Sequence, residues 1–110
     1  ERGSNNYYSI IQGCINNNLN TFDKINLMMM LTTELPVLRA RLGISQEALA
    51  KNIGLSRQTY CAIENGTRRM TWTIFMALVA FFDLNEATSV MLDQIPSFIE
   101  SIRKILREEE

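Results

Sequence analysis

The sequence predicts an all-α fold, and three observations favour that class. Apolar residues recur at spacings of three and four along most of the chain beyond residue 20, as one buried face of a helix requires. Only two prolines and five glycines interrupt 110 residues, which leaves room for long helices. Residues that favour helix ends stand where the periodic segments begin and end. A chain of this length is expected to form one domain with a real core.

Two helices are predicted in the first 43 residues. Residues 1–20 are rich in Asn and Ser and are interpreted as a tail or extension, part of which could come from a vector because the first residue is not Met. Residues 21–31 carry the first helical pattern. Thr32-Thr33 can cap a second helix, and Pro36 then falls in its first turn, where its missing N–H does no harm. That helix is expected to end at Gly43.

The chain is organised around residues 45–66, which are interpreted as two short helices joined by a tight turn. Ser45 and Ser56 can each cap a helix by accepting a backbone N–H that has no partner within the helix. Gly54 lies between the helices, where a left-handed conformation costs Gly little. Asn65-Gly66 is a helix stop. Three side chains of the second helix are expected to face away from the packed side: Arg57, Gln58 and Cys61.

Thr71 is expected to cap a further helix that runs to about Phe82. Apolar residues surround this helix, with Trp72, Phe75, Val79 and Phe82 on the expected core face and Ile74, Met76, Ala77, Ala80 and Phe81 on the other. Because a helix that is apolar all round must be covered all round, something outside a minimal fold should pack on it. The candidates are the N-terminal extension, the C-terminal helix and a second subunit.

Two more helices are predicted at the C-terminal end. A short one opens at Asn85 and runs to about Leu92, and Asp93 can cap the last one, with Pro96 in its first turn. The last helix has an apolar stripe, which either folds back on the core or pairs with a second copy of the chain. The stripe comprises Phe98, Ile99, Ile102, Ile105 and Leu106.

Caps, a turn glycine, a small residue and a Glu-Asn-Gly stop fall in register in five segments. These are Ile44-Ser45-Gln46-Glu47, Leu49-Ala50, Ile53-Gly54, Ser56-Arg57-Gln58-Thr59 and Ile63-Glu64-Asn65-Gly66. Together they resemble the helix-turn-helix of the lambda repressor and Cro family, also called the xenobiotic response element (XRE) family. The resemblance covers about residues 33–92 and departs at Tyr60, where the family usually has Ile or Val, and at Cys61-Ala62, where many relatives carry longer polar side chains.

The resemblance implies a lambda repressor-like DNA-binding domain with a five-helix core over residues 33–92. Residues 1–32 are then a partly helical N-terminal extension, and residues 93–110 are an added amphipathic C-terminal helix. In the family, the second helix of the motif, here residues 56–65, enters the major groove of DNA near its N-terminal end. Because the hydroxyl of a buried Tyr needs a partner, Tyr60 could alter the tilt of that helix.

Nine residues are carried over as DNA-binding candidates. Arg57 could form two hydrogen bonds to guanine O6 and N7, and Gln58 suits adenine N6 and N7. Gln46 matches the family's phosphate-contacting glutamine at a helix start, a position that favours an anion. The other candidates near the bases are Ser56 and Cys61, and those expected on the DNA backbone are Asn65, Thr67, Arg68 and Arg69.

The charge distribution fits a DNA partner better than the net charge of −1 does. Residues 34–70 carry six positive and three negative charges, whereas residues 71–110 carry three positive and seven negative ones. A local basic face is what phosphate contact needs, and the acidic remainder keeps the molecule in solution. The two cysteines form no metal or disulfide pattern, which favours a reducing cytoplasm. No apolar run approaches the roughly 18–20 residues that span a membrane, and no signal peptide is seen.

The favoured function is a sequence-specific regulator of transcription, expected to be a repressor, that binds a palindromic operator in double-stranded DNA as a homodimer. Two alternatives stay open: an antitoxin that controls its own operon and binds a toxin protein, and an interaction module that has lost DNA binding. An enzyme is not expected, because the chain has no His, no Gly-rich phosphate loop and no nucleophile motif. No cofactor and no metal site are expected either.

Overall fold

Six helices, α2 to α7, form residues 19–108, the residues that the computed structural model describes. They are α2 (Leu19–Leu42), α3 (Gln46–Asn52), α4 (Arg57–Glu64), α5 (Trp72–Asp83), α6 (Glu86–Gln94) and α7 (Phe98–Glu108). Within this range no residue belongs to a strand, so the predicted all-α class is confirmed. The interpretation of residues 1–20 as a tail or extension lies outside the described residues up to residue 18, and α2 already begins at Leu19.

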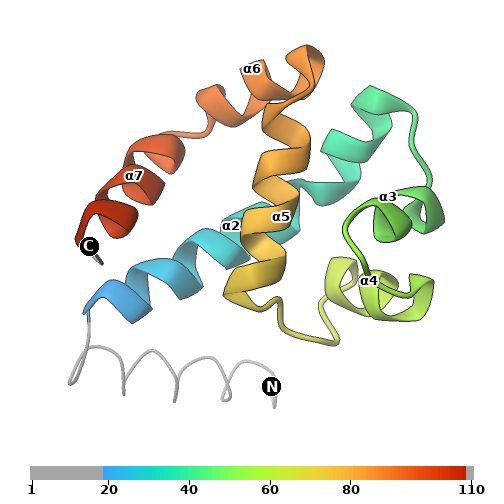
Figure 1. Ribbon diagram of the computed structural model, residues 1–110, viewed down its shortest axis with the longest axis horizontal. Helices are drawn as coiled ribbons and strands as arrows, with labels where there is room; N and C mark the ends of the chain where they lie inside the picture. Colours follow the sequence, from blue (N-terminus) through green and yellow to red (C-terminus); the bar gives the residue numbers. More distant parts are fainter. Residues whose placement is uncertain (1–18, 109–110) are drawn as a thin grey trace.

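Helix α2 is the central element, because α4, α5, α6 and α7 all pack against it. Figure 1 shows α5 crossing α2, with α3 and α4 near one end of the molecule and α7 at the other. The helices α2 to α6 supply the predicted five-helix core, and α7 is the added C-terminal helix. The motif helices α3 and α4 and the added helix therefore occupy opposite ends of one scaffold.

Helix α2 is continuous, so the predicted break at Thr32 and Thr33 is wrong. Their hydroxyls do not cap a new helix but donate to the carbonyls of Met28 and Met29, one turn back. Pro36 lies in the helix interior rather than in a first turn. There it removes one backbone hydrogen bond, at a cost of about 3 kcal/mol.

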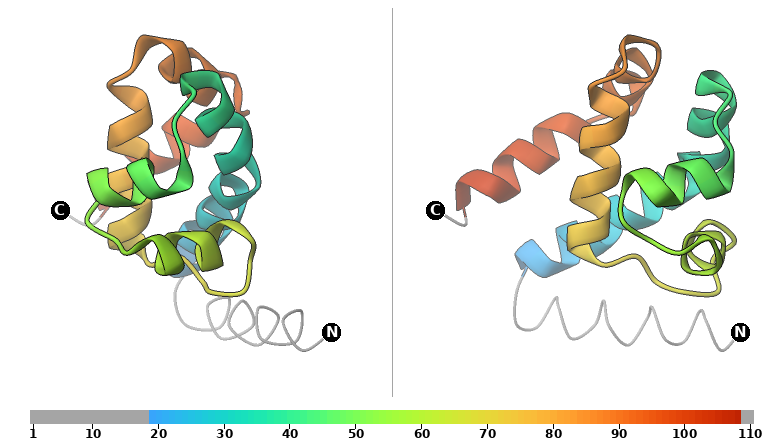
Figure 2. Two further views of the ribbon diagram at one scale, coloured as in Figure 1. Left: turned by 90° about the vertical axis from the view of Figure 1, so that its right-hand side faces the viewer. Right: turned by 45° about the vertical axis from the view of Figure 1, so that its right-hand side comes forward.

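An unbroken apolar stripe explains why α2 continues through Pro36. Four leucines on both sides of the proline are buried at helical spacing: Leu27, Leu31, Leu35 and Leu38. Burying each leucine side chain stabilises the fold by about 1.5–3 kcal/mol, so the stripe outweighs the cost of one proline. In Figures 1 and 2 the axis of α2 bends along its length, as an interior proline would cause.

Helices α3 and α4 begin and end where the caps predict. Ser45 Oγ accepts the backbone N–H of Ala48 at 3.0 Å, and Ser56 Oγ accepts that of Thr59 at 3.1 Å. Gly54 follows α3 with φ +80°, a left-handed conformation that a side chain would strain. The inner faces of the two helices are buried through Leu49, Ala50, Tyr60 and Ile63.

Two other helices cover the apolar surface of α5. Thr71 caps α5 as predicted, with its Oγ1 accepting from the backbone N–H of Ile74 at 3.2 Å. Phe98 of α7 meets the edge of Phe75 with ring centroids 5.8 Å apart. Lys24 of α2 places its Nζ 5.2 Å from the ring centroid of Trp72. The extra cover predicted for α5 thus includes the first half of α2 as well as α7.

The apolar stripe of α7 folds back on the core of the same chain, which is the first of the two alternatives predicted for it. Phe98, Ile102 and Ile105 are buried, while Leu106 at the end of the stripe is 43% exposed. The predicted start of this helix is wrong. Asp93 lies inside α6, and Pro96 lies in the turn before α7, because Ser97 has φ 62° and interrupts the helical backbone.

No single helix among residues 19–108 is long and apolar enough to cross a membrane. The consecutive helices α5 and α6 together have the length and apolar composition of a membrane-spanning segment, but their axes are bent by 118° at the break between them. Buried core helices can have the same length and composition, and the buried residues of α5 place it in the core.

Candidate nucleic-acid interface

The first turn of α4 presents its polar side chains to solvent. Ser56, Arg57 and Gln58 are all exposed, and Ser56 also donates from its hydroxyl to Thr59 Oγ1 at 3.0 Å. Within residues 19–108 no hydrogen bond or ion pair engages the side chain of Arg57 or Gln58. These two side chains are therefore available to an external partner.

The loop after α4 is held by its own hydrogen bonds. The carbonyl of Ala62 accepts the backbone N–H of Thr67 at 2.9 Å, and Gly66 makes this turn with φ +86°. Asn65 Oδ1 accepts both from the backbone N–H of Thr67, at 3.1 Å, and from its hydroxyl, at 2.8 Å. Asn65 and Thr67 are thus brought together, and both remain exposed.

Arg68 and Arg69 follow this turn and are exposed. We call the exposed residues Ser56, Arg57, Gln58, Arg68 and Arg69 the α4 surface. In Figure 2 (left), α3 and α4 lie toward the viewer, and the C-terminal helix lies behind. The α4 surface thus belongs to the end of the molecule that carries the two motif helices.

Two of the predicted contact residues bind each other instead of pointing separately outward. Gln46 and Cys61 are both half-buried, and the thiol of Cys61 donates to Gln46 Oε1 with 3.1 Å between the two atoms. Gln46 Nε2 donates to Glu64 Oε2 at 3.3 Å. Cys61 is therefore turned toward α3 rather than toward solvent, in contrast to Arg57 and Gln58.

Glu64 is the centre of a hydrogen-bond network that joins α2, α3 and α4. Arg39 forms two hydrogen bonds with its carboxylate, from Nε to Oε1 and from Nη2 to Oε2, both at 2.9 Å. Arg39 Nη1 also donates to the carbonyl of Ile44 at 3.0 Å. The hydroxyl of Tyr60 donates to Glu64 Oε1 at 2.6 Å, which supplies the partner that a buried Tyr needs.

The network shifts the titration of its members. Burial raises the pKa of Glu64, but the hydrogen bonds from Arg39 and Tyr60 outweigh burial and hold the pKa below its usual value. Burial raises the pKa of the Tyr60 hydroxyl, and its hydrogen bond to Glu64 raises it further. The hydrogen bond to Glu64 raises the pKa of Arg39. At neutral pH the network consists of a carboxylate, a guanidinium and a neutral phenol.

This network could be found only in part from the sequence. Tyr60 and Glu64 are four residues apart, which places them on one face of α4 and could have paired them. Arg39 is 25 residues from Glu64, and no local pattern connects the two. Glu64 therefore fixes α4 on the last turns of α2.

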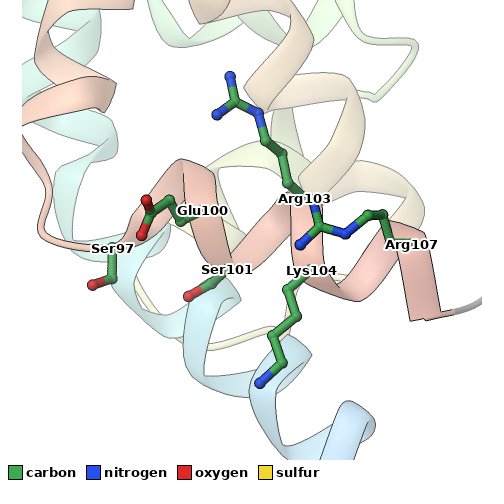
Figure 3. Close-up of a pocket in the computed structure, with 6 residues that line it drawn as sticks. All are labelled: Ser97, Glu100, Ser101, Arg103, Lys104 and Arg107. Atoms are coloured by element: carbon green, nitrogen blue, oxygen red, sulfur yellow. The ribbon is translucent and has the colours of Figure 1, made fainter.

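A second group of cations lies on α7. Figure 3 shows Arg103, Lys104 and Arg107 on this helix, with Arg103 and Lys104 extending in opposite directions. Together with Ser97, Glu100 and Ser101 they line a hollow of about 410 Å³. All three cations are exposed, and we call them the α7 surface. No ion pair within residues 19–108 engages them.

Within residues 19–108 no group of three or more His, Cys, Asp or Glu side chains is placed to hold a metal ion. The one network of titratable groups described above is built from structural contacts between helices, and its carboxylate already accepts hydrogen bonds on both oxygens. The arrangement positions α4 and leaves donors of that helix exposed.

Comparison with known proteins identifies the family. The family described as "Helix-turn-helix domain" matches residues 31–89, which is more than half of the chain. No curated protein and no solved structure matches the chain. The matched residues contain α3 and α4 with their caps, the Glu64 network and the α4 surface. The chain belongs to the helix-turn-helix domain family, whose fold is that of DNA-binding regulators.

Proposed function

We propose that this protein is a sequence-specific regulator of the lambda repressor and Cro (XRE) type, which reads the major groove of double-stranded DNA with α4. One observation carries the proposal. Arg57 and Gln58 are exposed, form no side-chain hydrogen bond within the described residues 19–108, and lie at the start of a helix that the Glu64 network holds in place. A rigid helix with free donors at its N-terminal end is the arrangement that reads base edges in the groove.

The residues divide between base and backbone contacts. Arg57 is proposed to bind guanine O6 and N7 with two parallel hydrogen bonds, and Gln58 to bind adenine N6 and N7. Ser56 lies beside them at the N-terminus of α4. Residues proposed on the phosphates are Gln46, Asn65, Thr67, Arg68 and Arg69. Such phosphate contacts fix the register of the protein, while the base contacts select the sequence.

The size of α4 supports a homodimer on a palindromic operator. Eight residues make a helix about 12 Å long, which can contact only a few base pairs. A few base pairs recur far too often in a genome to mark one site, so a second copy of the same reading helix is needed. We place the two half-sites about 34 Å apart, one turn of DNA. Repression then follows from occupying a promoter that overlaps the operator.

Selection from a random pool of DNA duplexes, read by sequencing, tests this proposal. We expect an enriched palindrome whose half-sites are separated by one or two helical turns, and binding that weakens steeply with salt. Absence of any enriched sequence, or binding that ignores salt, would contradict it and favour an interaction module. An antitoxin would also enrich a palindrome, but a toxin protein would copurify with it.

A further inference from the structure

The side-chain amide of Gln46 is held at two of its four hydrogen-bonding positions. Its carbonyl Oε1 lies 3.1 Å from the sulfur of Cys61, and its Nε2 lies 3.3 Å from Glu64 Oε2. An amide nitrogen carries two N–H groups, so one N–H is left over. Both partners come from α4, while Gln46 opens α3. The contacts therefore tie the start of one motif helix to the other.

The chemistry of the partners decides which way round the amide lies. An ionised carboxylate only accepts hydrogen bonds, so the nitrogen of Gln46 and not its carbonyl must face Glu64. Arg39 and Tyr60 favour this ionised form through their hydrogen bonds to the same carboxylate. The Cys61 thiol can then donate to the carbonyl. With either partner removed, the amide could rotate or present its carbonyl outward.

We propose that Cys61 and Glu64 are positioning residues that fix the amide of Gln46, so that its remaining N–H binds a phosphate oxygen of the DNA backbone. This inference rests on the proposed function, because it assigns partners to one of the phosphate contacts. It replaces the expected role of Cys61 as a group near the bases with an indirect one. The half-burial of Cys61 and the contact of its sulfur with Gln46 support this exchange.

A double-mutant cycle on the selected duplex tests the indirect role of Cys61. We expect Cys61→Ala to weaken binding by roughly threefold to tenfold, the usual value of one hydrogen bond. Gln46→Ala should weaken binding at least as much, and Cys61→Ala should add nothing in that background. Cys61→Ser should restore binding, because its hydroxyl can donate to the same carbonyl. A full effect of Cys61→Ala in the Gln46→Ala background, or no effect in the wild type, would overturn the proposal.

NMR on the free protein tests, without DNA, whether Cys61 and Glu64 hold the amide of Gln46 in place. The side-chain N–H₂ group of Gln46 should be restricted in its motion, whereas that of Gln58, which is exposed, serves as the mobile reference. In Cys61→Ala the Gln46 group should approach the mobility of Gln58, while the backbone spectrum of α4 stays unchanged. Equal mobility of the two groups in the wild type would overturn the proposal that the amide of Gln46 is fixed.

The two experiments separate the possible failures. A restricted Gln46 in a protein that enriches no DNA would refute the proposed function, and with it the phosphate role of this amide. A mobile Gln46 in a protein that binds a palindrome would refute the positioning role alone.

Discussion

The α4 surface and the α7 surface carry similar charge at opposite ends of the molecule, but they are built differently. Arg57 projects from a helix that is capped at its start and fixed at its end by hydrogen bonds from α2. Arg68 and Arg69 follow a turn that closes on the carbonyl of Ala62. The cations of the α7 surface lie on the solvent side of a helix that packs on the core through its apolar stripe.

The difference shows what a reading surface needs beyond positive charge. Phosphate attraction is non-directional and falls with salt, so either surface could attract a polyanion. Base readout needs a donor placed to within a fraction of an ångström, which requires a fixed helix. Within the described residues, the Glu64 network fixes α4 in this way, and none of its members lies on α7.

Removing the carboxylate at the centre of the network should have the largest effect. Glu64→Ala leaves the Arg39 guanidinium and the Tyr60 hydroxyl without their shared partner, and the two paired side chains are only 20% and 8% exposed for Arg39 and Glu64. We expect a loss of about 2–4 kcal/mol in the free energy of unfolding, measured by urea titration. Glu100→Ala, in the exposed α7 hollow, is the matched control and should leave stability unchanged. Equal stability of the two variants would contradict a structural role for the network.

Removing one side chain that is proposed to contact a base should weaken DNA binding without changing the fold. Arg57→Ala is expected to weaken binding to the selected duplex by about 1–3 kcal/mol and to relax base choice at one position. Arg103→Ala removes the same side chain from the α7 surface and should change neither quantity. Mobility-shift titrations on the selected site and on its single-base variants measure both. If the two variants behave alike, α4 is not the reading helix.

Removing two charges from each surface should separate phosphate contact from general attraction. Arg68→Gln with Arg69→Gln should weaken binding to all duplexes alike and reduce the slope of log affinity against log salt by about 2. The pair Arg103→Gln with Arg107→Gln lowers the net charge equally but should leave the slope nearly unchanged. Similar slopes for the two double variants would mean that only net charge matters.

The smallest effect is expected from the Tyr60 hydroxyl. Tyr60→Phe should lower stability by about 1 kcal/mol at pH 7, because Glu64 loses one donor. The raised pKa of Tyr60 means that its contribution is complete below about pH 10 and is lost as pH rises further. The variant should therefore lose stability less steeply above pH 10 than the wild type does. Identical alkaline limbs in urea titrations would show that the phenol does not titrate with folding.

Glu64 titrates in the opposite sense at the acid end. Its lowered pKa gives a contribution that is present above about pH 4 and is lost as pH falls through the folded-state value. Glu64→Gln should therefore lose stability less steeply below pH 4 than the wild type does. The same urea titrations, extended to pH 2, provide the measurement.

Local signals in the sequence predicted most of the fold. Ser45, Ser56 and Thr71 cap their helices, and Gly54 and Gly66 have positive φ where turns were expected. Each of these depends on a few adjacent residues, which a linear pattern contains. Pro36 was misplaced because its position depends on tertiary packing, since the buried leucine stripe keeps the helix continuous.

The exposed residues of the candidate site could be predicted from the sequence, but the contacts that hold its helices in place could not. Arg57 and Gln58 follow from helical spacing and are exposed as expected. The bond between Arg39 and Glu64 joins residues far apart in the chain, and the contact of Cys61 with Gln46 joins two helices. Such contacts depend on how the helices are arranged, which spacing along one helix does not reveal. Whether the nine candidate residues bind DNA stays a prediction.

The residues that anchor α4 differ from those that it exposes, so this fold is suitable for engineering proteins that bind other DNA sequences. Tyr60, Ile63 and Glu64 hold the helix from one side, whereas Arg57 and Gln58 are exposed and form no side-chain hydrogen bond or ion pair within residues 19–108. A library that varies only these two outward positions would keep every anchoring contact intact. Selected members could then recognise new operators on an unaltered frame.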